Sequence, residues 1–187
     1  MTATPADAYA AATRAYLAGQ RLDMRQLAGE VGVSRNTLYR WTGGREQLIG
    51  DVAWRLSEAA IRDIWASTAR RRGSSRLLAA LRGYVVVTVG SHALQSFVRN
   101  ETYAALRLLT SRGPFQDRLV AEVQRLIDEE AARGSWAPRS ETALLAYGVV
   151  RLIEGFVYNT ASGEQAGLLQ DDPAIDDALA VIRLLLD

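Results

Sequence analysis

Apolar residues recur three or four positions apart along almost the whole chain, and clusters of glycine, proline and serine interrupt them. No stretch shows the strict alternation of apolar and polar positions that marks a half-buried strand. The pattern therefore predicts an all-α protein. The expected helices cover residues 5–18, 24–31, 35–41, 45–71, 74–90, 92–100, 101–111, 114–133, 138–161 and 173–186.

Proline marks the start of several of these helices. Pro5, Pro114, Pro138 and Pro173 each stand where a run of helical spacing begins. The fixed φ of proline suits the first turn of a helix, and its missing N–H costs nothing there. We therefore expect helices to begin at these four residues.

The segment Leu22–Leu48 has the spacing of a helix-turn-helix. Asp23 and Ser34 can cap its two short helices, and Gly32 falls in the tight turn between them, where a positive φ is needed. Ala28 lies where the two helices cross closely. The apolar positions that the two helices can bury against each other are Leu27, Val31, Val33, Leu38 and Trp41.

The outward side of the second of these helices has the chemistry of a major-groove reader. Arginine can bond guanine O6 and N7 together, asparagine can pair with adenine, and threonine offers a hydroxyl and a methyl group. Tyr39 and Arg45 are better placed to contact phosphates, together with the free amides at the start of the next helix. For any single residue, the alternative is the solvated face of a short helix. The expected DNA-binding residues are Arg35, Asn36, Thr37, Tyr39, Arg40 and Arg45.

The stretch GVSRNTLYRWTGGREQL resembles the third helix and following turn of TetR-family regulators. The matching residues are Gly32, Val33, Ser34, Thr37, Leu38, Tyr39 and Leu48, and Arg45 stands at the family's lysine. Trp41 and Thr42 depart from the family pattern, and Thr42 replaces a phenylalanine that normally packs the third helix on the fourth. A MerR-like or excisionase-like module can show a similar motif, but it usually begins at the helix-turn-helix and adds a wing.

The resemblance implies a three-helix DNA-binding module in residues 1–50. It also implies a helical bundle in residues 51–187 that binds a ligand and forms a homodimer through the last two helices. The segment FVRNETYAALRLLTSRGPFQDRLVAEV, with the later VVRLIEGFVY, resembles the C-terminal domain of the QsdR-like subfamily, which is associated with lactone signalling. Both helices have apolar stripes, and the sequence leaves open which of these faces the partner and which faces the monomer core.

A ligand pocket is expected among the middle helices. Arg151 and Glu154 stand in an apolar setting, so this pair is either interfacial or placed to orient a ligand, although an ordinary intrahelical ion pair is the alternative. The aromatic candidates are more often plain core residues. The candidate pocket residues are Trp65, Tyr84, Phe97, Tyr103, Arg107, Arg151, Glu154 and Tyr158.

Charge and composition narrow the function. Residues 1–72 hold 11 arginines against 7 acidic residues, and residues 73–187 hold 11 against 14, so the front is basic and the rear acidic. The chain has no cysteine and a single histidine, His92, which excludes thiolate chemistry and a multi-histidine metal site. We expect no cofactor or metal, no secretory signal or membrane span, and a cytoplasmic location.

Together with these observations, the resemblance implies a one-component repressor that binds a palindromic operator as a dimer and is released by a small, largely apolar effector, such as a lactone. An enzyme is the first alternative, but the carboxylates of Glu101, Glu129, Glu130 and Glu154 show no catalytic spacing. The second alternative is a helical interaction protein or ligand sensor that has lost specific DNA binding. Thr42 and the glycine pair after it leave this interpretation open, because they depart from the family pattern.

Overall fold

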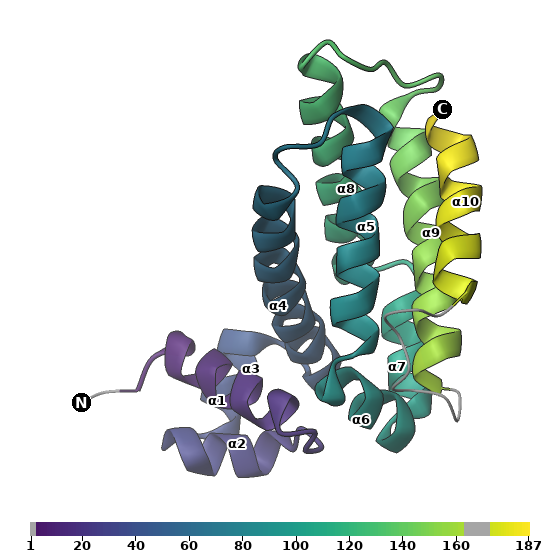
Figure 1. The fold of residues 1–187 in the computed structure, drawn as a ribbon. Coiled ribbons are helices and arrows are strands. Elements are labelled where there is room, and N and C mark those ends of the chain that lie inside the picture. The colour runs from purple at the N-terminus through teal and green to yellow at the C-terminus, as the bar shows by residue number, and fades with distance from the viewer. Residues whose placement is uncertain (1–2, 163–172) are drawn as a thin grey trace.

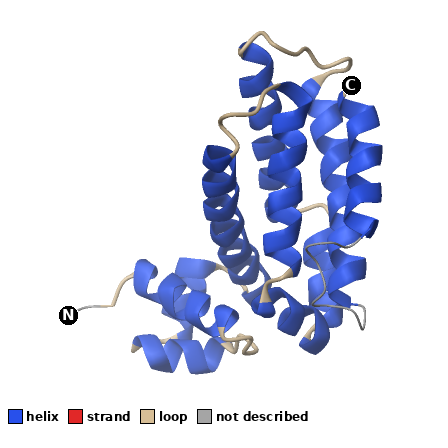
Figure 2. Cartoon of the chain, in the orientation of Figure 1, coloured by secondary structure: helices blue, strands red, loops and turns tan. Residues whose placement is uncertain are grey.

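The computed structural model describes residues 3–162 and 173–187. Every regular element in these ranges is a helix, and none is a strand (Figures 1 and 2). The all-α prediction is therefore confirmed. The helices are α1 (Pro5–Leu17), α2 (Met24–Val31), α3 (Arg35–Thr42), α4 (Arg45–Ser67), α5 (Gly73–Val89), α6 (His92–Asn100), α7 (Thr102–Thr110), α8 (Pro114–Ala132), α9 (Thr142–Ser162) and α10 (Pro173–Leu186).

The helices form a small module and a larger bundle (Figure 1). The module consists of α1, α2 and α3, and α4 runs from it into the bundle. Within the bundle α4 packs on α5 and α8, while α9 packs on α8, α5 and α10. The short helices α6 and α7 lie at the end of the bundle nearest the module, where α6 touches α1. Helix α10 lies beside α9 at the edge remote from α4.

The turn of the helix-turn-helix is built as the sequence predicts. Gly32 ends α2 with φ 77° and ψ 32°, a left-handed conformation that glycine adopts without strain. The Asp23 carboxylate accepts the amides of Arg25 and Gln26 at 2.8 Å, which holds the pKa of this carboxyl below its usual range. The Ser34 hydroxyl accepts the amide of Thr37 at 3.1 Å. Both short helices therefore begin at the residues that their caps predict.

Thr42 replaces a large apolar residue without leaving the third helix loose. Its side chain is buried, and its hydroxyl donates to the carbonyl of Leu38 at 3.0 Å, so no polar group is left without a partner. Leu38 and Leu48 are fully enclosed beside it. The substitution of threonine for phenylalanine at position 42 therefore leaves α3 packed at this point of the structure.

Helix α4 ends at Ser67, four residues before the predicted end near Arg71. The carbonyl of Trp65 accepts the Thr68 hydroxyl at 3.0 Å and the Arg76 guanidinium at 3.2 Å. In a longer helix this carbonyl would accept the amide of residue 69. Because side chains occupy it instead, the chain turns into α5 early.

The prediction that a helix begins at Pro138 is wrong, because α9 begins at Thr142. The Glu141 carbonyl accepts the first amides of this helix, from Leu144 and Leu145. Before it, Trp136 packs against Gly73 at the start of α5, where a Cβ on the glycine would stand 2.9 Å from the Trp136 Cβ. This contact holds the connection as a loop across the end of the bundle.

Among the described residues, no single helix has both the length and the apolar character of a membrane span, whereas the bent pair α5 and α6 satisfies both criteria when taken together.

Candidate nucleic-acid interface and ligand cavity

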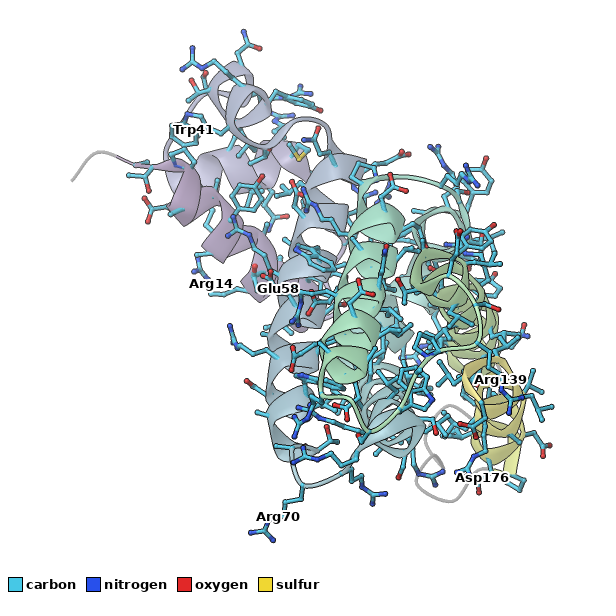
Figure 3. All side chains as sticks on the ribbon, turned by 90° about the horizontal axis from the view of Figure 1, so that it is seen from above. Arg14, Trp41, Glu58, Arg70, Arg139 and Asp176 are labelled. Carbon is cyan, nitrogen blue, oxygen red and sulfur yellow. The ribbon has the colours of Figure 1, made fainter. Side chains whose placement is uncertain are left out.

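The outer face of α3 carries polar side chains that contribute little to packing. Arg35, Asn36, Tyr39 and Arg40 are exposed, and Tyr39 shows 40% of its surface. Figure 3 shows Trp41 on the same outlying module, where it packs only partly buried against the core. The four exposed side chains present guanidinium, amide and phenol groups together, as a base-reading helix requires.

Thr37 and Arg45, the other two candidate DNA contacts, are already engaged within the chain. The Thr37 hydroxyl lies 2.9 Å from that of Ser34, so it supports the cap of α3. Arg45 donates to the carbonyl of Leu22 at 2.6 Å and pairs with Glu101 at the start of α7. Arg45 therefore joins the module to the bundle in this conformation.

A cavity of about 120 Å³, partly open to solvent, lies between the helices of the bundle. Its wall is apolar except for a few side chains, among them Ser57, Tyr84, Thr88 and Glu154. The apolar lining comes from α4, α5, α6, α7, α8 and α9, and includes Leu56, Leu94, Leu109, Phe115, Leu119, Ile153 and Val157. An apolar space with a few convergent polar groups is typical of a small-molecule site.

Glu154 is the most unusual polar group in this wall. Only 4% of its surface is exposed, and one carboxylate oxygen pairs with Arg151 at 2.8 Å. The other oxygen, Oε1, is buried and has no hydrogen-bond partner. Burial raises the pKa of this carboxyl to about 7, although the nearby Arg151 guanidinium lowers it.

Tyr84 stands beside Glu154 in the cavity wall. Its hydroxyl lies 3.0 Å from that of Ser57, so the two hydroxyls form a pair that joins α5 to α4. Burial raises the pKa of Tyr84, which keeps it a neutral hydrogen-bonding group. The cavity thus offers a carboxylate and a hydroxyl pair on an apolar background.

The remaining pocket candidates do not line this cavity. Tyr103 is 75% exposed on α7, and Trp65 is buried far from the module, where it donates to Glu129 at 2.8 Å under the Arg76 guanidinium. Phe97 is buried against Tyr16, with ring centroids 5.9 Å apart. Three others, Arg107, Arg151 and Tyr158, are also outside the wall of the 120 Å³ cavity.

Arg151 acts on the cavity indirectly. Besides Glu154, it bonds to Gln116 and to the carbonyl of Thr110 at 3.3 Å, so three contacts fix the guanidinium. Arg107 instead pairs with Glu46 at 3.1 Å across a groove of about 450 Å³ between α4 and the α7–α8 turn. Arg151 therefore positions the Glu154 carboxylate, and Arg107 positions that of Glu46.

Most residues of the cavity wall were not among the sequence candidates, and three of these are the polar residues Tyr16, Ser57 and Thr88. Helical spacing contains a signal for two of them. Ser57 follows the buried Ala53 by four residues on α4, and Thr88 follows Tyr84 by four on α5, so each lies on an inward stripe. Tyr16 comes from α1, and no local pattern indicates that α1 reaches the bundle.

Helices α9 and α10 present an apolar face to solvent. The inward positions Leu145, Val149, Ile182 and Leu186 are buried in the monomer core. The exposed apolar residues on these two helices include Leu144 at 65%, Tyr147, Leu152, Val181, Leu184 at 80% and Leu185. Exposed apolar area of this kind on two adjacent helices is characteristic of an interaction surface.

A helix-turn-helix module with a free polar face, joined by one long helix to a bundle with an internal cavity, is the architecture of a one-component transcriptional regulator. Residues 72–187 match the family model described as tetracyclin repressor-like, C-terminal domain. The chain belongs to the TetR family. Proteins of this family are transcription factors rather than enzymes: they bind DNA, act as dimers and respond to small-molecule effectors.

Solved structures of TetR-family proteins share the fold over nearly the whole chain. The transcriptional repressor QsdR from R. erythropolis is 25% identical, with a TM-score of 0.86 over 97% of this chain and 93% of that one. A regulator from Pectobacterium atrosepticum (19% identity, TM-score 0.66, 97% and 91% covered) has the same fold. The repressor AlkX from a Dietzia strain, implicated in biodegradation of n-alkanes, also has this fold (19% identity, TM-score 0.64, 98% of this chain and 97% of that one covered). No curated protein sequence matches the chain.

Proposed function

We propose that this chain is a repressor that binds a palindromic operator as a homodimer and is released when a small, largely apolar effector enters the 120 Å³ cavity. One observation carries the proposal: Tyr16 of α1 and four residues of α4 line this cavity. A molecule bound there touches the two helices that hold the helix-turn-helix. Residues 1–50 then act as the DNA-binding unit and 51–187 as the ligand-binding and dimerisation unit, with α4 shared between them.

On DNA, the exposed face of α3 enters the major groove. Arg35, Asn36 and Arg40 read base edges, while Tyr39 and the uncapped amides at the start of α4 contact phosphates. Thr37 and Arg45 join them when their internal contacts open. Two such helices about one DNA turn apart read the two halves of a palindrome.

The dimer forms through the exposed apolar face of α9 and α10, which sets the distance between the two recognition helices. Without effector, that distance matches the operator. The effector binds better to a state in which α1 and α4 have moved, so the population shifts and affinity for DNA falls. The subfamily resemblance suggests an effector that contains a lactone ring. The protein acts in the cytoplasm, where its operator is accessible.

Fluorescence anisotropy on DNA from upstream of its own gene tests the proposal, with a scrambled duplex at about 150 mM salt as the reference. Selective binding is expected to be on the order of a thousandfold tighter than non-specific binding. If that duplex binds no better than the scrambled one, selection from random sequences supplies the operator. Failure of that selection would leave a protein that has lost its DNA reader.

Arg40→Ala and Asn36→Ala are each expected to weaken selective binding roughly five- to hundredfold, because a good base contact contributes about 1–3 kcal/mol. The matched control is Arg139→Ala, an exposed arginine in the loop before α9 that lies far from Trp41 (Figure 3). Equal affinities for all three variants would contradict the assignment of α3 as the reading helix.

A further inference from the structure

The cavity wall holds one polar atom with no partner. Glu154 Oε1 is buried and has no hydrogen-bond partner, whereas Oε2 of the same carboxylate pairs with Arg151 at 2.8 Å. Leaving a buried carboxylate oxygen unbonded is costly, and a folded chain rarely keeps such an atom unless something else binds it. Above the raised pKa of about 7 this carboxyl is ionised and only accepts, so in that range the missing partner must be a hydrogen-bond donor.

The charge around this oxygen selects a neutral donor. Arg151 already balances the charge of Glu154, and Gln116 and the Thr110 carbonyl hold the guanidinium in place. A ligand carboxylate would meet Glu154 in an apolar space without a cation of its own, at a high desolvation cost. A ligand ammonium would place a second cation beside Arg151. A neutral N–H or O–H group meets neither penalty.

The rest of the wall fits the other parts of such a molecule. The hydroxyl pair of Ser57 and Tyr84 can donate to a carbonyl oxygen. Past Tyr84 lies a second, almost wholly apolar space of about 30 Å³, which shares Tyr84, Leu119 and Ile153 with the main cavity. The main cavity has about the size of one that holds a benzene ring. Together they fit a small ring or amide head with a short alkyl tail.

We propose that the effector is a neutral amphipathic molecule whose head donates an N–H or O–H hydrogen bond to Glu154 Oε1 and whose alkyl tail points past Tyr84. This inference rests on the proposed function, since it names the effector class of the same cavity. An amide or lactam satisfies it. A simple lactone or ester, which has acceptors only, does not.

Two probes of nearly identical shape test the donor. The lactam 5-ethylpyrrolidin-2-one and the lactone γ-hexanolactone differ in a ring N–H against a ring oxygen. Calorimetric titration at pH 8.5, where the carboxyl is ionised, is expected to show the lactam binding about ten- to hundredfold more tightly. The lactam is also expected to be the better releaser of operator DNA.

The double variant Arg151→Met/Glu154→Leu removes the acceptor without leaving a lone charge, and an apolar pair of similar size usually preserves folding. It is expected to bind lactam and lactone equally. The matched control is Glu122→Leu/Arg125→Met, which removes an ion pair of the same i, i+3 spacing on α8, outside the cavity, and should retain the preference.

Equal binding of the two probes to the wild type, tighter lactone binding, or a preference that survives in the double variant would each overturn the inference. So would the absence of binding by both probes. Hexanoate and hexylamine, tested for DNA release, separate this failure from failure of the proposed function. If hexanoate or hexylamine releases the DNA, the proposed function stands and only the inferred effector class is wrong. If no probe releases the DNA, the result counts against both the effector class and the proposed function.

Discussion

Glu154 carries a free-energy cost that its neighbours offset only in part. Arg151 satisfies one oxygen, while the other stays buried without a partner. The result is a carboxyl whose pKa is raised from an ordinary 4.5 to about 7 by burial. The titratable groups around it are Arg151 on the same helix, Tyr84 on α5 and Tyr16 on α1. Burial raises the pKa of both tyrosines, so neither changes charge near neutral pH.

Stability should therefore fall as the pH rises between about 4.5 and 7. In this window the folded protein keeps a proton on Glu154 that the unfolded chain has released, so unfolding gains from each step up in pH. The total loss attributable to this residue is roughly 3 kcal/mol, reached above pH 7. Glu154→Gln removes the titration, so the stability of the variant relative to wild type should rise between pH 5 and pH 8.

Urea unfolding of both proteins at pH 5, 6, 7 and 8 measures this difference. Comparing the change with pH removes any constant cost of the glutamine beside Arg151. A difference in free energy of unfolding that stays constant from pH 5 to pH 8 would show that Glu154 titrates normally.

At the same residue scale, the sequence predicted some residues of the cavity wall and not others. Tyr84 and Glu154 were predictable because a polar group on an apolar helix stripe must face either a partner or a cavity. Trp65 and Tyr103 have equally suggestive side chains, yet one bonds to Glu129 and the other faces solvent. Their surroundings come from residues distant in sequence, which local spacing does not encode.

At the scale of elements, the helices were predictable and two of their ends were not. Caps such as Asp23 and Ser34 act within three residues, so the sequence contains the whole interaction. The early end of α4 depends on Arg76, eleven residues beyond the Trp65 carbonyl that it binds. The late start of α9 accompanies the packing of Trp136 on Gly73, which is distant in sequence. Long-range side-chain contacts therefore moved these two boundaries.

The tight turn after α2 provides a test at this scale. Gly32→Ala is expected to destabilise the protein by about 1 kcal/mol, because alanine at φ 77° is strained. The cost is conformational only, since a Cβ at this position would meet no atom within 4 Å. Thermal unfolding should show a lower Tm.

Gly29→Ala is the matched control in the same helix. A Cβ there also meets nothing within 4 Å, but the residue lies inside α2, where alanine favours the helix over glycine by about 1 kcal/mol. The two substitutions should shift the Tm in opposite directions. If both substitutions shift the Tm in the same direction, the left-handed conformation is not the reason that position 32 requires glycine.

At the scale of the whole molecule, three ion pairs join the start of α4, next to the DNA-binding module, to α7 and α8. Arg45 pairs with Glu101, Arg107 with Glu46 at 3.1 Å, and Arg118 with Asp51 at 2.8 Å. Tyr9 of α1 also donates to Asp51 at 3.1 Å. Each contact joins α1 or the first turns of α4 to helices that border the cavity. Under the proposed mechanism, these contacts are the route by which a shift of α7 or α8 would reach the module.

The same scale decides whether that shift can reach DNA, because a change in spacing has meaning only in a dimer. The proposed interface on α9 and α10 has Leu184 as its most exposed apolar residue, at 80%. Leu184→Glu places a charge on that face, and burying an unpaired charge is strongly unfavourable. Sedimentation should show the dimer dissociation constant rising at least a hundredfold, with operator affinity falling as the dimer is lost.

Leu17→Glu adds the same charge at an exposed leucine of α1, 52% exposed and away from both helices, and should leave the dimer intact. If Leu184→Glu remains dimeric at nanomolar concentration, the two subunits must meet elsewhere. The distance between the recognition helices would then be set by another face, and the route proposed from cavity to operator would have to pass through it. If dimerisation is lost while folding, measured by circular dichroism, is kept, α9 and α10 set the operator spacing.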